Sequence, residues 1–127
     1  MERTLAIIKP DAVAAGHTGE ILATIEAAGF RIAALRRVWL NAAQAKAFYA
    51  VHNGKSFFDS LIAFMTEGPC VPMVLERDDA IATWREVLLP IRERFGTDAT
   101  RNAVHGSDAP ETAAVEIGFL FAGSEIV

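Results

Sequence analysis

Thr4-Leu5-Ala6-Ile7-Ile8-Lys9-Pro10-Asp11 is the most informative stretch for the fold of this chain of 127 residues. Its first five residues form a continuous, largely apolar run, and Lys9-Pro10-Asp11 ends that run. A short apolar run bounded by turn residues is typical of a strand buried on both faces, and proline disfavours helical backbone in the residue before it. The stretch therefore predicts a central strand with Lys9 at its end, where ligand-binding groups are common in α/β folds.

Outward from this strand, apolar periodicity and turn residues predict the remaining elements. They are, in order, a helix from Thr18 to Gly29, a strand over Phe30–Leu40, a helix capped by Asn41 that ends near Asn53-Gly54, a helix capped by Ser56 with Asp59 that ends at Gly68, a strand over Val71–Leu75, a helix from Asp78 or Asp79 to Pro90, a polar irregular stretch over Ile91–His105, a helix from Asp108, and a final strand over Ile117–Phe121. This order predicts an α/β (α+β) sandwich, a ferredoxin-like, largely antiparallel four-stranded sheet covered by helices.

Length, composition and charge bound the function. The length suits a single domain over residues 1–127, and an apolar content of 52% excludes a wholly disordered chain. Twelve Lys and Arg against sixteen Asp and Glu leave a net charge of −4, which argues against sequence-specific or bulk-charge binding of nucleic acid. Nine of the twelve cations are arginine, whose planar fork matches phosphate, although solubilising surface arginines explain the bias equally well.

Cysteine usage and the lack of long apolar runs bear on location. Cys70 is the single cysteine and lies in an apolar stretch, so we expect a buried thiol in a reducing compartment. Nothing resembles a signal peptide, and no apolar run approaches the roughly 20 residues that a membrane-spanning helix needs. We therefore expect a cytoplasmic protein that does not associate with membranes.

The strongest candidate for chemistry is Arg101-Asn102-Ala103-Val104-His105-Gly106-Ser107-Asp108. It brings a cation, an amide, an imidazole, a glycine and a helix cap together. A neutral imidazole, with an unperturbed pKa of about 6.5, is a competent nucleophile or proton acceptor at pH 7. We expect Gly106 to leave a bulky group free access to His105, and His17 and His52 to be surface residues. The local pattern also fits a histidine that merely caps a turn.

This octet closely resembles the active-site string of the nucleoside diphosphate kinases. The N-terminal stretch from Arg3 to Val13 resembles the opening strand and loop of that family. Further matches follow in the order of the family: Gly19-Glu20-Ile21, Gly29-Phe30-Arg31, Phe48-Tyr49, Phe57-Phe58, Gly68-Pro69 and Glu116-Ile117-Gly118. The resemblance therefore covers nearly the whole chain.

The resemblance implies a phosphohistidine enzyme. Such an enzyme transfers the γ-phosphoryl group of a nucleoside triphosphate to a nucleoside diphosphate by a ping-pong mechanism, and so maintains the NTP and dNTP pools. His105 is then the nucleophile, and Glu116 accepts the other ring N–H. The implied substrates are ATP, ADP, GTP, GDP and deoxynucleoside diphosphates. Mg²⁺ is the implied cofactor, held by nucleotide phosphates and water without ligands from the protein.

The same resemblance assigns cations to the phosphates. Lys9 is expected at the sugar–phosphate end of the nucleotide, and Arg85 and Arg92 at the β- and γ-phosphates, because phosphoryl transfer needs neutralised and positioned oxygens. We expect Arg85 on the helix before Pro90 and Arg92 beyond it, so that the intervening segment must bring them together. As isolated residues, both arginines also fit ordinary surface charge.

Four further residues have implied roles around the nucleoside and the histidine. Asn102 contacts the ribose hydroxyl, Tyr49 places its hydroxyl near the histidine, and Phe57 stacks on the base. An aromatic face accepts any base, so broad nucleotide specificity is expected. Ser107 supports Glu116, whereas Phe58 fits an apolar helix face and is expected in the core.

The chain departs from the family pattern between Arg85 and Arg92. Only Glu86-Val87-Leu88-Leu89-Pro90-Ile91 remains where the family usually carries a substantially longer loop with a phosphate-contacting threonine. The C-terminal tail is also short. Because that loop meets neighbouring subunits in hexameric members, we expect a homo-oligomer built from a dimer, with a dimer or tetramer preferred over a hexamer.

A non-catalytic nucleotide-binding or regulatory protein on the same scaffold is the alternative. Such proteins usually lose the histidine or the arginine clamp. His105, Lys9, Arg85, Arg92 and Asn102 are all present in this chain. The sequence therefore favours an active enzyme.

Overall fold

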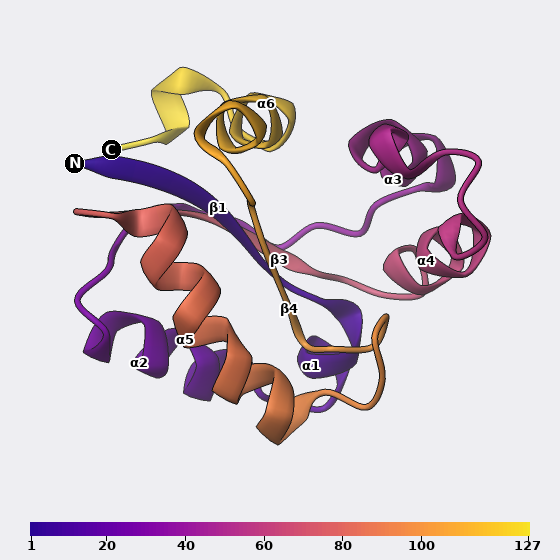
Figure 1. Ribbon diagram of the computed structural model, residues 1–127, viewed down its shortest axis with the longest axis horizontal. Helices are drawn as coiled ribbons and strands as arrows, with labels where there is room; N and C mark the ends of the chain where they lie inside the picture. Colours follow the sequence, from indigo (N-terminus) through magenta and orange to yellow (C-terminus); the bar gives the residue numbers. More distant parts are fainter.

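The computed structural model, which describes residues 1–127, is built around a four-stranded sheet in the order β2-β3-β1-β4 (Figure 1). The strands are β1 (Glu2–Ile8), β2 (Arg31–Leu35), β3 (Val71–Arg77) and β4 (Val104–Gly106). Every neighbouring pair of strands is antiparallel. This confirms the predicted ferredoxin-like α+β sandwich and the position of the first apolar run as a central strand, between β3 and β4.

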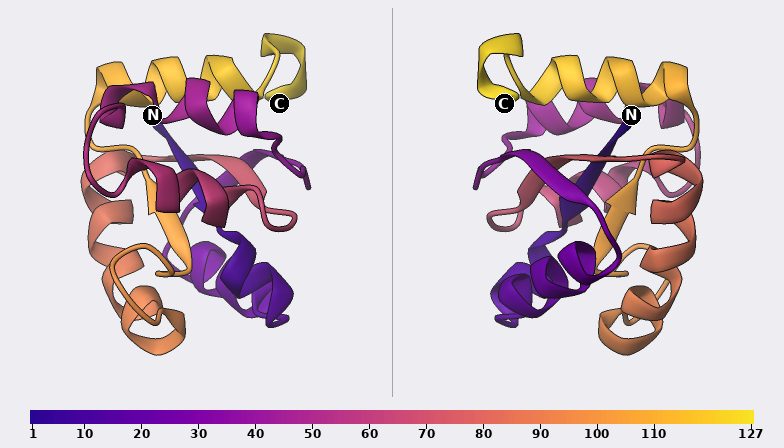
Figure 2. Two further views of the ribbon diagram at one scale, coloured as in Figure 1. Left: turned by 90° about the vertical axis from the view of Figure 1, so that its right-hand side faces the viewer. Right: turned by 90° about the vertical axis from the view of Figure 1, so that its left-hand side faces the viewer.

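Helices cover both faces of the sheet (Figures 1 and 2). One face packs against α1 (Pro10–Ala14), α2 (Thr18–Ala27) and α5 (Ala80–Phe95). The other packs against α3 (Ala42–Phe48), α4 (Phe58–Met65) and α6 (Pro110–Leu120). Two short 3₁₀ helices, η1 (Ala50–His52) and η2 (Gly123–Glu125), complete the chain. None of the helices combines the length and the apolar character needed to span a bilayer.

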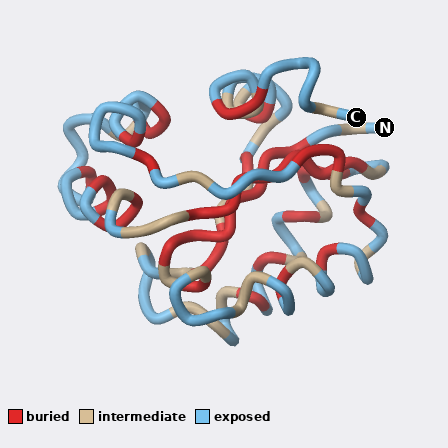
Figure 3. Tube along the Cα trace, turned by 180° about the vertical axis from the view of Figure 1, so that it is seen from behind, coloured by how far each residue is buried: buried red, intermediate tan, exposed pale blue.

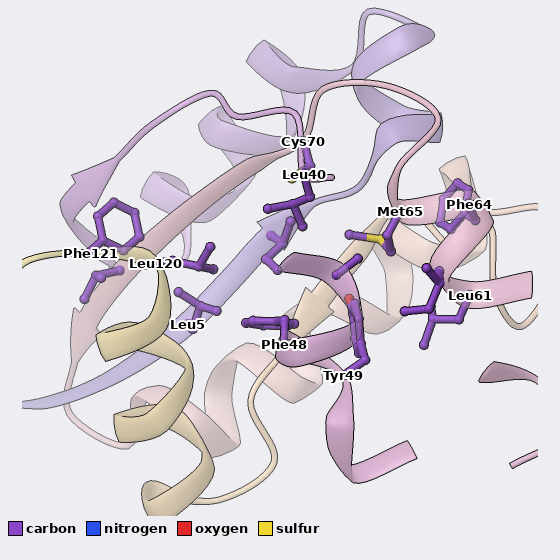
Figure 4. Packing of buried hydrophobic residues seen from close by; sticks show 14 of the residues in the cluster. Leu5, Leu40, Phe48, Tyr49, Leu61, Phe64, Met65, Cys70, Leu120 and Phe121 are labelled. Carbon is purple, nitrogen blue, oxygen red and sulfur yellow. The ribbon is translucent and has the colours of Figure 1, made fainter. Parts of the chain in front are cut away.

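Alternation along β1 divides the core into two layers. Leu5 and Ile7 belong to the cluster beneath α3, α4 and α6, whereas Ala6 and Ile8 belong to the cluster beneath α2 and α5. Successive side chains of a strand point to opposite faces, so one buried strand supplies both layers. Figure 3 shows the buried band along the sheet, and Figure 4 shows the first cluster, including Phe48 and Tyr49.

The last strand of the sheet lies where the sequence predicts irregular chain. Ile117–Phe121, predicted as a strand, forms the end of α6 and the residue after it. The fourth strand is β4, three residues long and paired only with β1. A strand this short carries too little apolar periodicity to stand out among polar turn residues. Helix α6 begins at Pro110 and is preceded by Ala109, not by Asp108.

Pro90 does not stop its helix. Helix α5 runs without a break from Ala80 to Phe95, with Pro90 inside it. Pro90 and Glu86, whose carbonyl loses its helical donor, are both exposed, so water can satisfy that carbonyl. The segment between Arg85 and Arg92 is therefore helix, with no loop between the two arginines.

Several predicted boundaries and caps also differ. Asn41 caps α3 in a capping box with Gln44, as predicted. Strand β2 spans only Arg31–Leu35, with a bulge between Ile32 and Ala34, and the predicted continuation to Leu40 keeps only an isolated bridge between Val38 and Cys70. Helix α4 begins at Phe58 without the predicted Ser56 cap. Single capping residues are weak signals where tertiary packing already holds the helix end.

Candidate active site

His105 lies in β4 opposite Ile7 of β1, and this register directs its side chain to the face covered by α3 and α6. The side chain is 16% exposed. Its Nε2 is 3.0 Å from Oε1 of Glu116 on α6, whose side chain is 13% exposed. An imidazole nitrogen facing a carboxylate carries the proton. Nε2 is therefore the donor, and Nδ1 is left with a free lone pair.

Ser107 steadies the same carboxylate. Its hydroxyl donates to Oε1 of Glu116 at 2.7 Å and accepts from the backbone N–H of Leu5 at 3.3 Å. Ser107 is fully buried, so its rotamer is held by β1 on one side and Glu116 on the other. The carboxylate that orients His105 is thus itself oriented by the sheet.

A cleft of about 200 Å³ opens beside His105. It is lined by Lys9, Phe48, Tyr49, Val51, His52, Phe57, Leu61, Ala99, Thr100, His105 and Glu116. These residues come from the end of β1, the α3–α4 region, β4 and the loop before it, and α6. Lys9, Tyr49, Phe57, His105 and Glu116, all singled out in the sequence, therefore meet at one cleft. Arg85, Arg92 and Asn102 are not part of its lining.

Tyr49 and Phe48 pack against the imidazole. Their rings lie 6.1 and 5.6 Å from the His105 ring, both edge-to-face. Tyr49 is buried, and its hydroxyl has no hydrogen-bond partner. Burial first, and the Glu116 carboxylate second, raise the pKa of Tyr49 far above its ordinary value. The phenol therefore stays neutral and keeps a donor for a ligand.

Lys9 joins the first strand to the loop before β4. Its Nζ donates to Oδ1 of Asn102 at 2.7 Å. Burial, and next the charge of Arg92, lower the pKa of Lys9 to about 8, while Asp11 acts in the opposite direction. Lys9 is charged at pH 7 and has only one strong partner, so an anion entering the cleft would stabilise its charged form.

Arg85 and Arg92 share one face of α5, because seven residues make almost two helical turns. The expectation that they belong to separate segments is therefore wrong. Arg92 donates from Nε and Nη2 to the carbonyl of Val104, at 3.3 and 3.0 Å. Burial and the nearby Arg85 charge lower the pKa of Arg92. Arg92 is therefore close enough to interact electrostatically with both Arg85 and Lys9.

Phe57 stands at the mouth of the cleft and is 42% exposed. Phe58, in contrast, is buried in the core, as predicted. The ring of His52 lies 5.3 Å from the Phe57 ring, and Lys55 Nζ lies 3.2 Å from His52 Nδ1. His52 is partly exposed, as predicted, but it also lines the cleft, which the sequence did not predict. Its short distance in sequence from Phe57 was the only signal for this placement. His17 is also half-buried, with its ring 4.2 Å from that of Phe95.

The role of Gly106 differs from the one expected. A Cβ at Gly106 would lie 2.6 Å from Cδ1 of Trp84 and 3.0 Å from Cδ2 of Leu88. The indole Nε1 of Trp84 donates to the His105 carbonyl at 3.0 Å. Space at Gly106 is therefore filled by α5 and does not provide access to the imidazole. The glycine lets α5 pack closely behind β4.

No group of three His, Cys, Asp or Glu side chains is arranged to hold a metal ion. The only carboxylate of the cleft, Glu116, is occupied by His105 and Ser107. The cleft therefore offers a metal ion no carboxylate that is free of other hydrogen bonds.

The site thus combines an imidazole hydrogen-bonded to a carboxylate with the lysine at the end of β1, on a ferredoxin-like sheet. The family model "Nucleoside diphosphate kinase" matches residues 2–126. A nucleoside diphosphate kinase of Syntrophotalea carbinolica is 55% identical over 137 residues, covering all of both chains. The structure of the Aquifex aeolicus nucleoside diphosphate kinase has a TM-score of 0.97 at 45% identity, with 99% of each chain covered. The chain belongs to the nucleoside diphosphate kinase family.

A second solved structure carries a ligand. It is the nucleoside diphosphate kinase of Halobacterium salinarum in complex with CDP, with a TM-score of 0.94, 33% identity, and coverage of 99% of this chain and 91% of that one. The alignment with the Syntrophotalea carbinolica protein extends over 137 residues, against 127 in this chain. At least ten positions of that alignment are therefore gaps in this chain.

Proposed function

We propose that this chain is a nucleoside diphosphate kinase that transfers a phosphoryl group through a phosphohistidine at His105. The observation that carries the proposal is the pairing of His105 Nε2 with Glu116, because it leaves Nδ1 free as the nucleophile. Relatives up to 55% identical bear the name of the enzyme. Together with the retained histidine, this favours catalysis over a non-catalytic nucleotide-binding protein.

The proposed first half-reaction conserves atoms and charge in one in-line displacement. The Nδ1 lone pair forms a bond to the γ-phosphorus, and the bond from that phosphorus to the β–γ bridging oxygen breaks. The nucleoside diphosphate leaves, and a second one takes the phosphoryl group by the reverse path. As the ring becomes phosphorylated, Glu116 holds the Nε2–H and stabilises the positive charge.

In this proposal the cations neutralise the phosphate oxygens, and the phenol donates a hydrogen bond to them. Lys9 and Arg92, with Arg85, supply positive charge next to the histidine, and Tyr49 supplies a neutral donor. Asn102 is proposed to orient Lys9 as well as to contact the ribose hydroxyl. Mg²⁺, bound to the phosphates and water, would neutralise further charge on the substrate.

Labelling with ATP tests the proposal. Protein incubated with γ-³²P-ATP is expected to acquire a label that is stable in base, labile in acid and removed by a nucleoside diphosphate. An unlabelled protein that binds ADP would instead be the non-catalytic alternative.

The buried ammonium of Lys9 predicts a pH dependence. Its pKa of about 8 means that the free protein holds the charge below pH 8 and loses it above. The value of kcat/KM reports the free enzyme, so we expect it to fall as pH rises through about 8. Lys9→Arg, with a guanidinium that stays protonated, should lose this fall even if its activity is lower. A wild-type profile that is flat to pH 9.5 would contradict the assignment.

Phe57 is expected to bind the base without distinguishing bases. Phe57→Ala should weaken binding of ADP, GDP, CDP and UDP alike, by about 1–3 kcal/mol each, because stacking uses the face and not the edge of a base. Isothermal titration with the four diphosphates measures this. Phe57→Trp, which keeps an aromatic face, should restore most of the affinity. A loss confined to one base would show that another group recognises a base edge.

We also propose a cytoplasmic homo-oligomer based on a dimer. Leu35, Trp39 and Phe119 are large apolar side chains exposed near the β2 edge of the sheet. Trp39 and Phe119 also line a cavity of about 340 Å³. A second copy of this chain would cover these side chains, and sedimentation velocity measures whether it does.

A further inference from the structure

The backbone turns sharply just before the catalytic strand. Ala103 has φ of +73°, and the N–H of Val104 donates to the carbonyl of Asn102 at 2.9 Å. When a backbone N–H bonds to the carbonyl two residues earlier and the residue between them has a positive φ, the backbone forms the rare type of γ-turn. Alanine adopts this conformation only at an energetic cost, and such strain is concentrated at functional sites.

The beginning of α1 holds this turn at both peptide groups. The N–H of Ala103 donates to Oδ2 of Asp11 at 3.1 Å, and the carbonyl of Ala103 accepts from the N–H of Lys9 at 2.8 Å. Ala103 itself is fully buried in the cluster beneath α5. The strained residue is therefore fixed by two contacts from residues more than 90 positions away in sequence.

The turn lies between two proposed site residues. Asn102, on one side, accepts from Lys9 Nζ at 2.7 Å. On the other side, Val104 pairs with Ile8 and begins the register that brings His105 opposite Ile7. A change of φ at Ala103 would therefore move the Asn102 amide relative to the imidazole.

The Asp11 carboxylate has no other hydrogen bond. Its Oδ1 is buried without a partner, so Oδ2 and the Ala103 N–H make its single contact of this kind. The Asp11 charge acts on Lys9, and it adds to the hydrogen bond with Glu67 that mainly raises the pKa of Arg101. A half-buried carboxylate with this single hydrogen bond is better explained by the turn it holds than by its place in α1, a helix of five residues.

We propose that Asp11 is a positioning residue for phosphoryl transfer, whose carboxylate holds the γ-turn at Ala103 and thereby sets Asn102 and His105 relative to the nucleotide. This inference rests on the proposed function. It predicts that the contribution of Asp11 depends on the strain at Ala103, because glycine adopts positive φ without that cost.

A double-mutant cycle tests the dependence. We expect Asp11→Ala to slow single-turnover phosphorylation of His105 by γ-³²P-ATP about 10- to 100-fold, because small displacements of reacting groups have effects of that size. In the Ala103→Gly background the same change should cost less than about three-fold. Asp11→Asn, which keeps an oxygen acceptor, should lose less than Asp11→Ala and covers the case in which Asp11→Ala does not fold.

A matched control separates this role from general support of the loop. Asp98 also accepts backbone N–H groups, those of Thr100 and Arg101 at 2.8 Å, but does not touch the γ-turn. Asp98→Ala should slow phosphorylation much less than Asp11→Ala. An Asp11→Ala rate within two-fold of wild type, an equal loss in the Ala103→Gly background, or an equal loss in Asp98→Ala would each overturn the positioning role. Absence of label in the wild-type protein would instead overturn the proposed function itself.

Discussion

His105→Ala is expected to abolish phosphoryl transfer, lowering turnover on the order of 10⁴-fold or more. His105 is the only imidazole of the cleft that a carboxylate orients, whereas His52 faces the Lys55 ammonium. Tyr49 is a buried neutral phenol, and Lys9 is engaged with Asn102, so we expect no other group to replace the proposed nucleophile. The side chain is 16% exposed and bonds only to Glu116, so its removal should leave the fold and ADP binding largely intact. Coupled turnover assays and ADP titration measure the two quantities.

The prediction also specifies which ring nitrogen of His105 carries the phosphoryl group. Because Nε2 faces Glu116, we expect the phosphoryl group on Nδ1, which ³¹P-correlated NMR of base-stabilised protein distinguishes from Nε2. His52→Ala is the matched control, since it removes the other imidazole of the cleft and should still accept the label. Label retained by His105→Ala, or attached to Nε2, would refute the proposed geometry.

Trp84→Ala is expected to reduce the free energy of unfolding by about 3–5 kcal/mol, a large share of the stability of a domain of this size. The indole is 0% exposed, packs edge-to-face on Phe30 with ring centroids 6.1 Å apart, and donates to the His105 carbonyl. Its loss leaves a cavity between α5 and the sheet and removes a hydrogen bond to the strand that carries His105. Urea unfolding followed by circular dichroism measures the effect.

Leu89→Ala is the control for this change. Leu89 lies on the same helix but is 59% exposed, so its replacement should alter stability by less than about 0.5 kcal/mol. The contact with Gly106 can be tested in the same series. Gly106→Ala should cost about 1–3 kcal/mol in the wild-type background, where its Cβ meets the indole, and much less with Trp84→Ala. Equal costs in both backgrounds would show that the indole is not what excludes a side chain there.

Much of the fold follows from local patterns in the chain. The run ending at Lys9-Pro10 predicted a central strand, and Asn41 predicted the start of α3, because burial on both faces and side-chain capping act over a few residues. Pro90 shows the limit of such rules. Its local preference against helix was outweighed by the burial of Trp84, Leu88 and Ile91 along one face of α5.

Part of the candidate site could also be predicted from a local pattern in the sequence. The polar string around His105 stood out without any tertiary information, and five of the residues singled out meet at the cleft. His52 did not stand out, since its partners Phe57 and Lys55 acquire meaning only once η1 folds beside the cleft. The purpose of Gly106 was misjudged because Trp84, which fills its space, is distant in sequence.

By itself, then, the chain determined which residues alternate into the core, where the polar string around His105 lies, and which chemistry an imidazole there can perform. Only the tertiary structure decided which ring nitrogen is free, how Arg85 and Arg92 come to share a helix face, and how Ala103 is held at a positive φ by Asp11. These outcomes depend on pairs such as Asp11 with Ala103 and Trp84 with His105. Contacts of that kind form between separate elements, and no periodicity or turn preference within either element encodes them.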